Sequence, residues 1–322
     1  MRCFSTSTPL GSASIIISSL SFLITRTVAQ YTLRNTYDAS NFFDYFTFFT
    51  GADPTNGFVD YVPQSVAEND HLVYYTNNQV YLGVDHTTQN PSGGRASVRL
   101  SSDIPYTKGL FIADIAHMPG GICGTWPAFW MFGPNWPASG EIDIIEGVNT
   151  QTTNSITLHT SPGCTVSNAN SLSGTTTVGS DCNAGNANTG CGVTTSNPQT
   201  YGKGFNAIGG GVYAMQWEST GIYVWFFPRG SIPSDITSGK PTTQSWGMPL
   251  ATFTGGGCDF NTAFSNQNIV FDTTFCGGWA GGVWGSGSCA SLAGSCEAYV
   301  ANNPEAFTDA YWLVNSVKVY QL

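Results

Sequence analysis

Short runs in which apolar and polar residues alternate recur along the whole of this 322-residue chain. A two-residue period places every second side chain on one face, which is typical of a half-buried β-strand. Turn-forming pairs such as Asn56-Gly57 and Gly133-Pro134 separate the runs, and no stretch shows a long helical period. The pattern therefore predicts an all-β sandwich or barrel. The clearest runs span residues 80–84, 111–115, 142–144, 156–158, 222–226 and 313–319.

The chain shows no sign of an internal division between domains. No charged block, proline-rich hinge or repeat interrupts residues 30–322, so we expect a single domain there. One short helix is predicted at residues 304–309, because Asn303 can cap its start and Pro304 suits the first helical position.

The composition excludes several classes of protein. Charged residues make up 9% of the chain, and the net charge is −10 with only 10 basic residues. Nucleic acid is therefore not an expected partner, because binding it requires a basic surface. A helical bundle would need many more Glu, Lys and Leu residues at helical spacing. Aromatic residues make up 13% of the chain, which opposes disorder.

The first 29 residues are typical of a secretory signal peptide. Arg2 precedes an apolar run at residues 14–24, and the small residues before Gln30 suit a signal peptidase. The run is too short to span a bilayer, which needs about 20 apolar residues. A buried first strand or a membrane anchor are the alternatives. We expect a secreted, extracellular protein that begins at Gln30 and does not bind membranes after the signal is removed.

The cysteine count agrees with secretion. Of nine cysteines, Cys3 lies in the predicted signal peptide, and the remaining eight predict four disulfides without revealing their pairing. A metal site is the alternative, but no Cys-x-x-Cys pair is present. Three of the cysteines lie in residues 161–206, a segment rich in Gly, Ser, Thr and Asn, which we expect to be a long surface loop held by disulfides. The loop could shape a binding cleft or be an ordinary exposed loop.

Three acidic residues in GEIDIIEG, at residues 140–147, carry the chemical signal of the sequence. In a strand, Glu141 and Asp143 share one face, but strict alternation would turn Glu146 toward the apolar face. A lone carboxylate is costly to bury there. One extra residue near Ile144 and Ile145, forming a β-bulge, would return Glu146 to the face of the other two acids. We therefore predict a bulged strand with three carboxyl groups on one side.

Three carboxyl groups that repel one another are suited to acid–base chemistry. Repulsion and burial keep one carboxyl protonated while another stays ionised, and glycoside hydrolysis needs that division. A site for a hard cation and a solvated acidic strand face are the alternatives. Three tryptophans, Trp126, Trp130 and Trp136, precede the acids and offer flat platforms for sugar rings, although a single Trp often packs in a core. His159 lies on the next predicted strand, where hairpin pairing would place it beside the acids.

These segments resemble glycoside hydrolase family 16, whose catalytic signature has the bulged form E-x-D-x-x-E. The flanking GTWPAFWMFG and TLHTSPGC resemble secreted fungal laminarinase-type members of that family, namely endo-1,3(4)-β-glucanases. So do FDTTFCGGWAG at residues 271–281 and YWLVNSVKVYQ at residues 311–321. The resemblance implies a β-jelly-roll sandwich of two curved antiparallel sheets, like concanavalin A, with a cleft across the concave face.

The resemblance also implies the catalytic roles. Glu141 would be the nucleophile, Glu146 the general acid/base, and Asp143 a hydrogen-bonding partner that tunes Glu141. The activity would be retaining endo-hydrolysis of β-1,3 or mixed β-1,3/1,4 glucans through a covalent glycosyl-enzyme, with no cofactor and no metal.

Substrate-binding positions follow from the same resemblance. Trp136 and His159 would lie around the scissile bond, Trp130 would form the floor of the cleft, and Trp279 would contact substrate. Two positions depart from the family pattern: Gly278 stands where Asp is expected, and Asn56 stands where His is common. A β-glucan is the expected partner, and we expect a monomer. A cell-wall transglycosylase and a non-catalytic β-glucan-binding jelly roll remain as alternatives.

Overall fold

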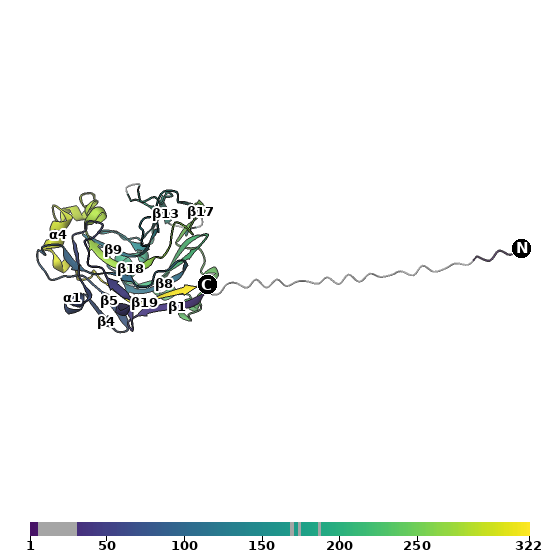
Figure 1. Ribbon diagram of the computed structural model, residues 1–322, viewed down its shortest axis with the longest axis horizontal. Helices are drawn as coiled ribbons and strands as arrows, with labels where there is room; N and C mark the ends of the chain where they lie inside the picture. Colours follow the sequence, from purple (N-terminus) through teal and green to yellow (C-terminus); the bar gives the residue numbers. More distant parts are fainter. Residues whose placement is uncertain (6–30, 168–170, 173–174, 186–187) are drawn as a thin grey trace.

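The computed structural model describes residues 1–5, 31–167, 171–172, 175–185 and 188–322. The predicted signal peptide at residues 1–29 lies for the most part outside these described residues. Within them, two large antiparallel sheets form a sandwich, which confirms the predicted all-β class. In Figure 1, strands β9 and β18 of one sheet lie above β8 and β19 of the other, with α4 at one end and β13 at the opposite end.

The two sheets divide the strands between a cleft side and an outer side. In the order of their hydrogen-bonded neighbours, the described strands of the cleft-side sheet are β13 (Thr175–Gly179), β14 (Cys191–Thr195), β11 (Ser155–His159), β10 (Glu141–Glu146), β9 (Thr125–Phe132), β18 (Asn268–Phe275), β7 (Arg99–Ser102) and β2 (Phe46–Phe48). Those of the outer sheet are β12 (Thr165–Ser167), β17 (Ala251–Gly257), β16 (Gly221–Pro228), β15 (Gly211–Glu218), β8 (Gly109–His117), β19 (Trp312–Gln321), β5 (Gln79–Leu82) and β4 (Val73–Thr76), with β1 (Thr32–Asp38) also paired to β19. A short parallel pair joins β3 (Val59–Tyr61) to β6 (Arg95–Ser97).

Helices are short and lie in the connections between strands. The described α-helices are α1 (Gln64–Asn69), α2 (Gly202–Ala207), α3 (Ser234–Thr237) and α4 (Cys296–Asn302). The described 3₁₀ turns are η1 (Phe42–Asp44), η2 (Pro198–Thr200), η3 (Arg229–Ser231), η4 (Thr243–Ser245), η6 (Trp284–Ser286), η7 (Ser288–Ser291) and η8 (Pro304–Phe307), and η5 (Gly277–Gly281) is a π-turn. The short helix predicted at residues 304–309 forms as the 3₁₀ turn η8, which has Pro304 at its first position and ends at Phe307. The side chain of Asn303 does not cap this turn and instead donates a hydrogen bond back to Tyr299.

The core fills the space between the two sheets. Phe129 and Met131 of β9 and Ile142 of β10 pack toward Phe111 of β8 and Met215 of β15, all within one buried cluster. Alternate residues of the cleft-side strands therefore face inward to the core, which leaves their neighbours facing outward into the cleft. This alternation is what places polar side chains on the open face of the sheet.

Four disulfides form, as the eight cysteines predicted. They join Cys123 to Cys289, Cys164 to Cys258, Cys182 to Cys191 and Cys276 to Cys296. Two of them hold residues 161–206, as expected of that segment. The expectation of a surface loop is nevertheless wrong for part of it, because β13 and β14 extend the cleft-side sheet beyond β11. In β14, the buried Val193 supplies the apolar contact that the Gly- and Ser-rich composition concealed.

Candidate active site

The acidic strand β10 has the predicted bulge. Its pairing with β11 shifts register between Asp143 and Glu146, and its pairing with β9 shifts between Asp143 and Ile145. Ile142, Ile144 and Ile145 are buried in the core, so the three acids lie on the other face. The bulge therefore places Glu146 on the same face as Glu141 and Asp143, at the position in the strand that the sequence predicted.

Asn154, which was not among the residues predicted for the site, stabilises this bulge. Its side-chain amide donates a hydrogen bond to the carbonyl of Ile144 at 2.8 Å and accepts one from the backbone N–H of Glu146 at 3.0 Å. Asn154 is fully buried. Because a bulge leaves backbone groups without a partner strand, a buried amide that satisfies one donor and one acceptor fixes the orientation of Glu146.

The three acids lie in a cleft with a volume of about 950 Å³. All seven side chains that the sequence assigned to catalysis or substrate binding line this cleft: Glu141, Asp143, Glu146, Trp130, Trp136, His159 and Trp279. Trp126 lines it as well, and so do the two positions that depart from the family pattern, Asn56 and Gly278. The structure thus brings together residues that are as much as 223 positions apart in the chain, from Asn56 to Trp279.

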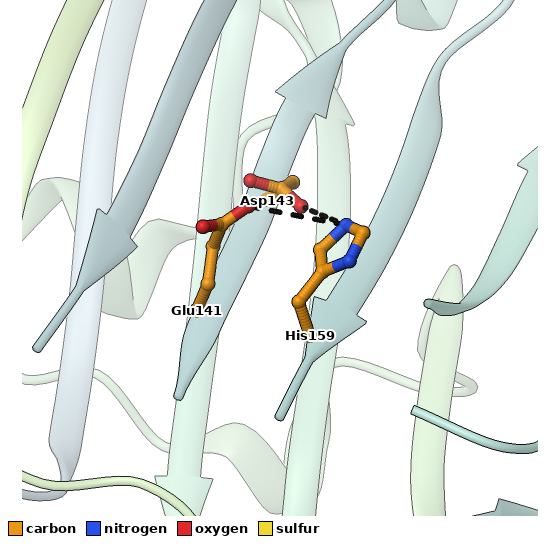
Figure 2. Close-up of side chains that lie close together, drawn as sticks. All are labelled: Glu141, Asp143 and His159. Carbon is orange, nitrogen blue, oxygen red and sulfur yellow. Dashed lines mark ion pairs between the residues drawn. The ribbon is translucent and has the colours of Figure 1, made fainter. Parts of the chain in front are cut away.

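His159 lies beside two of the carboxyl groups. Its Nε2 atom is 3.4 Å from Asp143 Oδ2 and 3.9 Å from Glu141 Oε1, and Figure 2 shows the imidazole turned toward both. The position follows from the predicted hairpin, because His159 on β11 pairs directly with Glu141 on β10. The side chains of His159, Asp143 and Glu141 are only 8%, 4% and 16% exposed. These three residues also have the donor atoms and the spacing to hold a metal ion.

Glu146 has a different hydrogen-bonding environment. The indole N–H of Trp126 donates a hydrogen bond of 2.8 Å to Glu146 Oε1. Trp126 in turn contacts Trp279 edge to face, with ring centroids 5.6 Å apart. A donor that is fixed by a second aromatic ring holds the Glu146 carboxyl group in one place.

Burial raises the pKa of all three acids. It raises the pKa of Glu141 to about 8, and the charge of Asp143 adds to the shift. It also raises the pKa of Glu146 to about 8, again with a contribution from Asp143, while the hydrogen bond from Trp126 opposes the shift. The pKa of Asp143 itself lies well above its ordinary value because of burial and of nearby Asp272. Near neutral pH the cluster therefore retains protons that isolated carboxyl groups would lose, as a general acid requires.

A fourth carboxyl group, on Asp272 of β18, was not predicted. It accepts hydrogen bonds from Trp130 Nε1 at 3.2 Å and from the hydroxyl of Tyr61 at 3.1 Å. Burial raises its pKa to about 6, although the positive charge of Arg99 opposes the shift. The guanidinium of Arg99 lies over the ring of Trp130, 4.8 Å from its centroid. Trp130 is thus held by an anion at its edge and a cation on one face, which fixes its ring in the cleft floor.

The remaining aromatic residues lie at different depths. Trp136 is 45% exposed, which leaves its ring available to a ligand. Trp279 lies in the π-turn η5 and reaches the cleft beside Trp126. The extension formed by β13 and β14 supplies further lining residues, including Val178, Asn188 and Thr194. The segment 161–206 therefore does shape the cleft.

Comparison with known proteins identifies the family of the chain. A family model described as XgeA-like, catalytic GH16 domain matches residues 46–320. The chain is 49% identical over 323 residues to a protein of Aspergillus fumigatus named a probable endo-1,3(4)-β-glucanase, an alignment that covers 97% of this chain and 49% of the relative. The chain belongs to glycoside hydrolase family 16. It spans about half the length of the curated relatives that head the comparison.

Two solved structures of glycoside hydrolase family 16 share the fold over nearly the whole chain. One is laminarinase 16A of Phanerochaete chrysosporium with β-glucans in both donor and acceptor sites, at 43% identity and a TM-score of 0.84, covering 91% of this chain and 100% of that one. The other is an elongating β-1,3-glucosyltransferase, at 47% identity and a TM-score of 0.84, covering 90% of this chain and 100% of that one. The jelly-roll sandwich predicted from the resemblance is confirmed.

Proposed function

We propose that this chain is a secreted endo-glycosidase that cleaves internal β-1,3 or mixed β-1,3/1,4 linkages of glucans with retention of configuration, and that residues 30–322 form its catalytic domain. The observation that carries the proposal is the bulged strand β10, which directs Glu141, Asp143 and Glu146 into one cleft lined with tryptophans. Relatives named as endo-1,3(4)-β-glucanases and a laminarinase with bound β-glucans support the choice of substrate.

The proposed mechanism divides the acid–base work between two carboxyl groups. Glu141 attacks the anomeric carbon while the protonated Glu146 gives its proton to the departing glycosidic oxygen. A proton held on Asp143 removes a negative charge beside Glu141, which allows Glu141 to ionise. Once the glycosyl ester forms, Glu141 carries no charge. Repulsion on Glu146 then falls, and Glu146 can accept a proton from the water that attacks the ester.

The aromatic residues would position the glucan. We assign Trp130, Trp136 and Trp279 to contacts with the apolar faces of glucosyl units, since a tryptophan ring offers a flat surface of matching size. The fixed ring of Trp130, held by Asp272 and Arg99, supports its place as the cleft floor. His159 would act on Asp143 and Glu141 rather than on distant parts of the substrate.

The decisive experiment compares Glu141→Gln with the wild type on laminarin, lichenan and carboxymethyl-cellulose. We expect release of reducing ends from laminarin and lichenan by the wild type and background activity in the variant. Glu297→Gln, which changes an exposed carboxyl group on α4, is the matched control and should keep full activity. NMR of the first products should show the β-anomer. Full activity in Glu141→Gln would refute the assignment of the nucleophile.

A second candidate is glucosyl transfer, because the chain is 47% identical to an elongating β-1,3-glucosyltransferase of the same family. Both reactions share the glycosyl-enzyme, and they differ in whether water or a glucan attacks it. Incubation with laminari-oligosaccharides and separation of the products by length distinguishes them. Products longer than the starting oligosaccharide would favour transfer, and shorter products alone would favour hydrolysis. Glucan binding with no turnover at all would favour a binding module.

Secretion is part of the proposal. Four disulfides within the described residues fit an oxidising compartment. In the part of the chain that the structure describes, no helix combines the length and the apolar character needed to cross a bilayer. Sequencing the N-terminus of protein collected from a culture medium should give Gln30 as the first residue, and an N-terminus at Met1 would contradict the signal peptide.

A further inference from the structure

Glu141, Asp143 and His159 present three different side-chain donor atoms to one point in the cleft. The atoms concerned all lie within 4.8 Å of one another. Figure 2 shows that they come from two adjacent strands, with the imidazole on β11 facing both carboxyl groups on β10. The direct pairing of His159 with Glu141 across the strands fixes this approach.

One of the separations matches that of ligands around a zinc ion, and a second is slightly longer. Zinc binds His nitrogen and carboxylate oxygen at roughly 2.0–2.2 Å, so two ligands in a tetrahedral shell lie about 3.3–3.6 Å apart. The Nε2 atom of His159 is 3.4 Å from Asp143 Oδ2, within that range, and 3.9 Å from Glu141 Oε1, slightly beyond it. The donor oxygens of Glu141 and Asp143 lie within 4.8 Å of each other, so the Glu141 carboxyl group would move closer when a metal binds.

Two further observations distinguish these residues from an ordinary group of acids. Asp143 Oδ2 is buried and has no hydrogen-bond partner among the described residues, although its side chain is only 4% exposed. The imidazole of His159 is also more than nine-tenths buried, and its Nε2 points at the two carboxyl groups. A buried acceptor without a donor and a buried nitrogen facing it are arranged as a cation would require.

The donor set favours a transition metal over a hard cation. Calcium takes six to eight oxygen ligands, and magnesium keeps an octahedral shell of oxygens with several waters. Two carboxylates and one imidazole fit zinc, which accepts three protein ligands and leaves one position for water. A bound dication would displace the protons that the two carboxyl groups retain, and the two carboxylates would then match its charge.

We propose that Glu141, Asp143 and His159 form a three-ligand site for a transition-metal dication, represented by Zn²⁺, and that metal binding there blocks the cleft. The metal has no part in the proposed glycosidase reaction. It would occupy the nucleophile Glu141 and the space where the anomeric carbon must arrive, so inhibition would be reversible and competitive with glucan. The inhibition rests on the proposed function, whereas the binding of Zn²⁺ does not.

We expect the affinity of this site for Zn²⁺ to be moderate. Metal-bound histidines almost always donate their second ring N–H to a neighbouring group, and loss of such a partner weakens binding by about 10–100-fold. Among the described residues, His159 Nδ1 has no hydrogen-bond partner. We therefore expect a dissociation constant in the range of about 1–100 µM, well above that of a structural zinc site.

Titration calorimetry of the full chain with ZnCl₂ tests the binding. The titrated full chain retains residues 1–29, so the parent and every variant carry Cys3→Ser to remove the exposed free thiol that could also bind zinc. We expect one site, at least about tenfold weaker binding in His159→Asn and in Asp143→Asn, and no measurable binding of Mg²⁺. His71→Asn, which changes an exposed histidine far from the acids in sequence, is the matched control and should bind Zn²⁺ like the parent. Equal affinity in all variants, or no binding in the parent, would overturn the site.

Competition with a laminari-oligosaccharide separates this proposal from the proposed function. If both are correct, Zn²⁺ raises KM for glucan without lowering kcat, and EDTA restores the original rate. If zinc binds in calorimetry but the chain cleaves no glucan, the metal site stands and the glucanase assignment fails. If the chain cleaves glucan and bound Zn²⁺ changes only kcat, or changes neither constant, the metal lies outside the cleft and the inhibitory site is refuted.

Discussion

Replacing Trp126 with Phe should move the alkaline side of the pH–activity profile. The indole N–H of Trp126 donates a 2.8 Å hydrogen bond to Glu146 Oε1, and this bond favours the ionised carboxylate. Phe cannot donate, so the pKa of Glu146 should rise from about 8. A hydrogen bond to a charged group is worth about 1.5–3 kcal/mol, and one pKa unit corresponds to about 1.4 kcal/mol. Because Trp126 is partly exposed and water can replace some of the bond, we expect a shift near the lower end, about one unit.

The assay is the pH dependence of kcat/KM on a laminari-oligosaccharide, which reports the protonation of the free enzyme. In the proposed mechanism Glu146 acts as the acid, so the falling limb should move to higher pH in Trp126→Phe. Trp136→Phe is the matched variant, because the Trp136 side chain makes a hydrogen bond that lowers the pKa of Glu141. It should move the rising limb to higher pH and leave the falling limb in place. The two limbs of the pH profile report on Glu141 and Glu146 as a coupled pair, so neither limb gives the pKa of one residue alone. The test is therefore which limb moves in each variant relative to the other. An unchanged falling limb in Trp126→Phe would refute the role of this hydrogen bond.

Three further outcomes follow from the structure. Burial and Asp143 are the main causes of the raised pKa of Glu146, and Asp272 adds to them; Asp272→Asn should therefore move the falling limb of kcat/KM to lower pH, opposite to Trp126→Phe. The pKa of Glu141 is about 8 in the folded chain against an ordinary 4.5, so wild-type stability falls as pH rises between these values, and Glu141→Gln should raise Tm more at pH 9 than at pH 4. Joint replacement of Cys123 and Cys289 by Ala should lower the free energy of unfolding by about 2–5 kcal/mol in guanidinium titrations, because their disulfide closes a separation of 166 residues.

The bulge in the acidic strand β10 could be predicted because strict alternation in its sequence would bury one carboxyl group, and one extra residue avoids this. Strict alternation places Glu141 and Asp143 on one face of the strand and Glu146 on the apolar face. A bulge near Ile144 and Ile145 keeps the Glu146 carboxyl group out of the core. Register with both neighbouring strands shows the shift at that point. His159 could be predicted for a related reason, since a short turn makes the next strand the hairpin partner. Both inferences depend only on residues close in sequence.

The position of Asp272 in the cleft could not be predicted from residues close in sequence. The alternation in NIVFDTTF, at residues 268–275, gives a signal, because Ile269 and Phe271 are in the core and Asp272 must then face outward. Nothing in the sequence reveals that β18 lies beside β9, more than 100 residues earlier, and so brings Asp272 to Trp130. The same applies to Arg99, whose neighbour Asp272 is reached through β7. Pairings between distant strands are set by the whole sheet rather than by local pattern.

Part of the segment 161–206 was predicted as a surface loop but forms strands. Its composition does not distinguish the glycines of a loop from glycines that are required where two parts of the chain pack closely. Gly190 has a φ of +61°, and a Cβ atom there would lie 2.6 Å from the carbonyl oxygen of Leu158 and 2.8 Å from two atoms of the His159 ring. The disulfide from Cys182 to Cys191 holds the adjacent residue. Gly190, a residue type that is common in loops, thus packs directly against the imidazole that faces Glu141 and Asp143. In this segment the absence of a side chain is what allows His159 to lie where Asp143 and Glu141 can reach it.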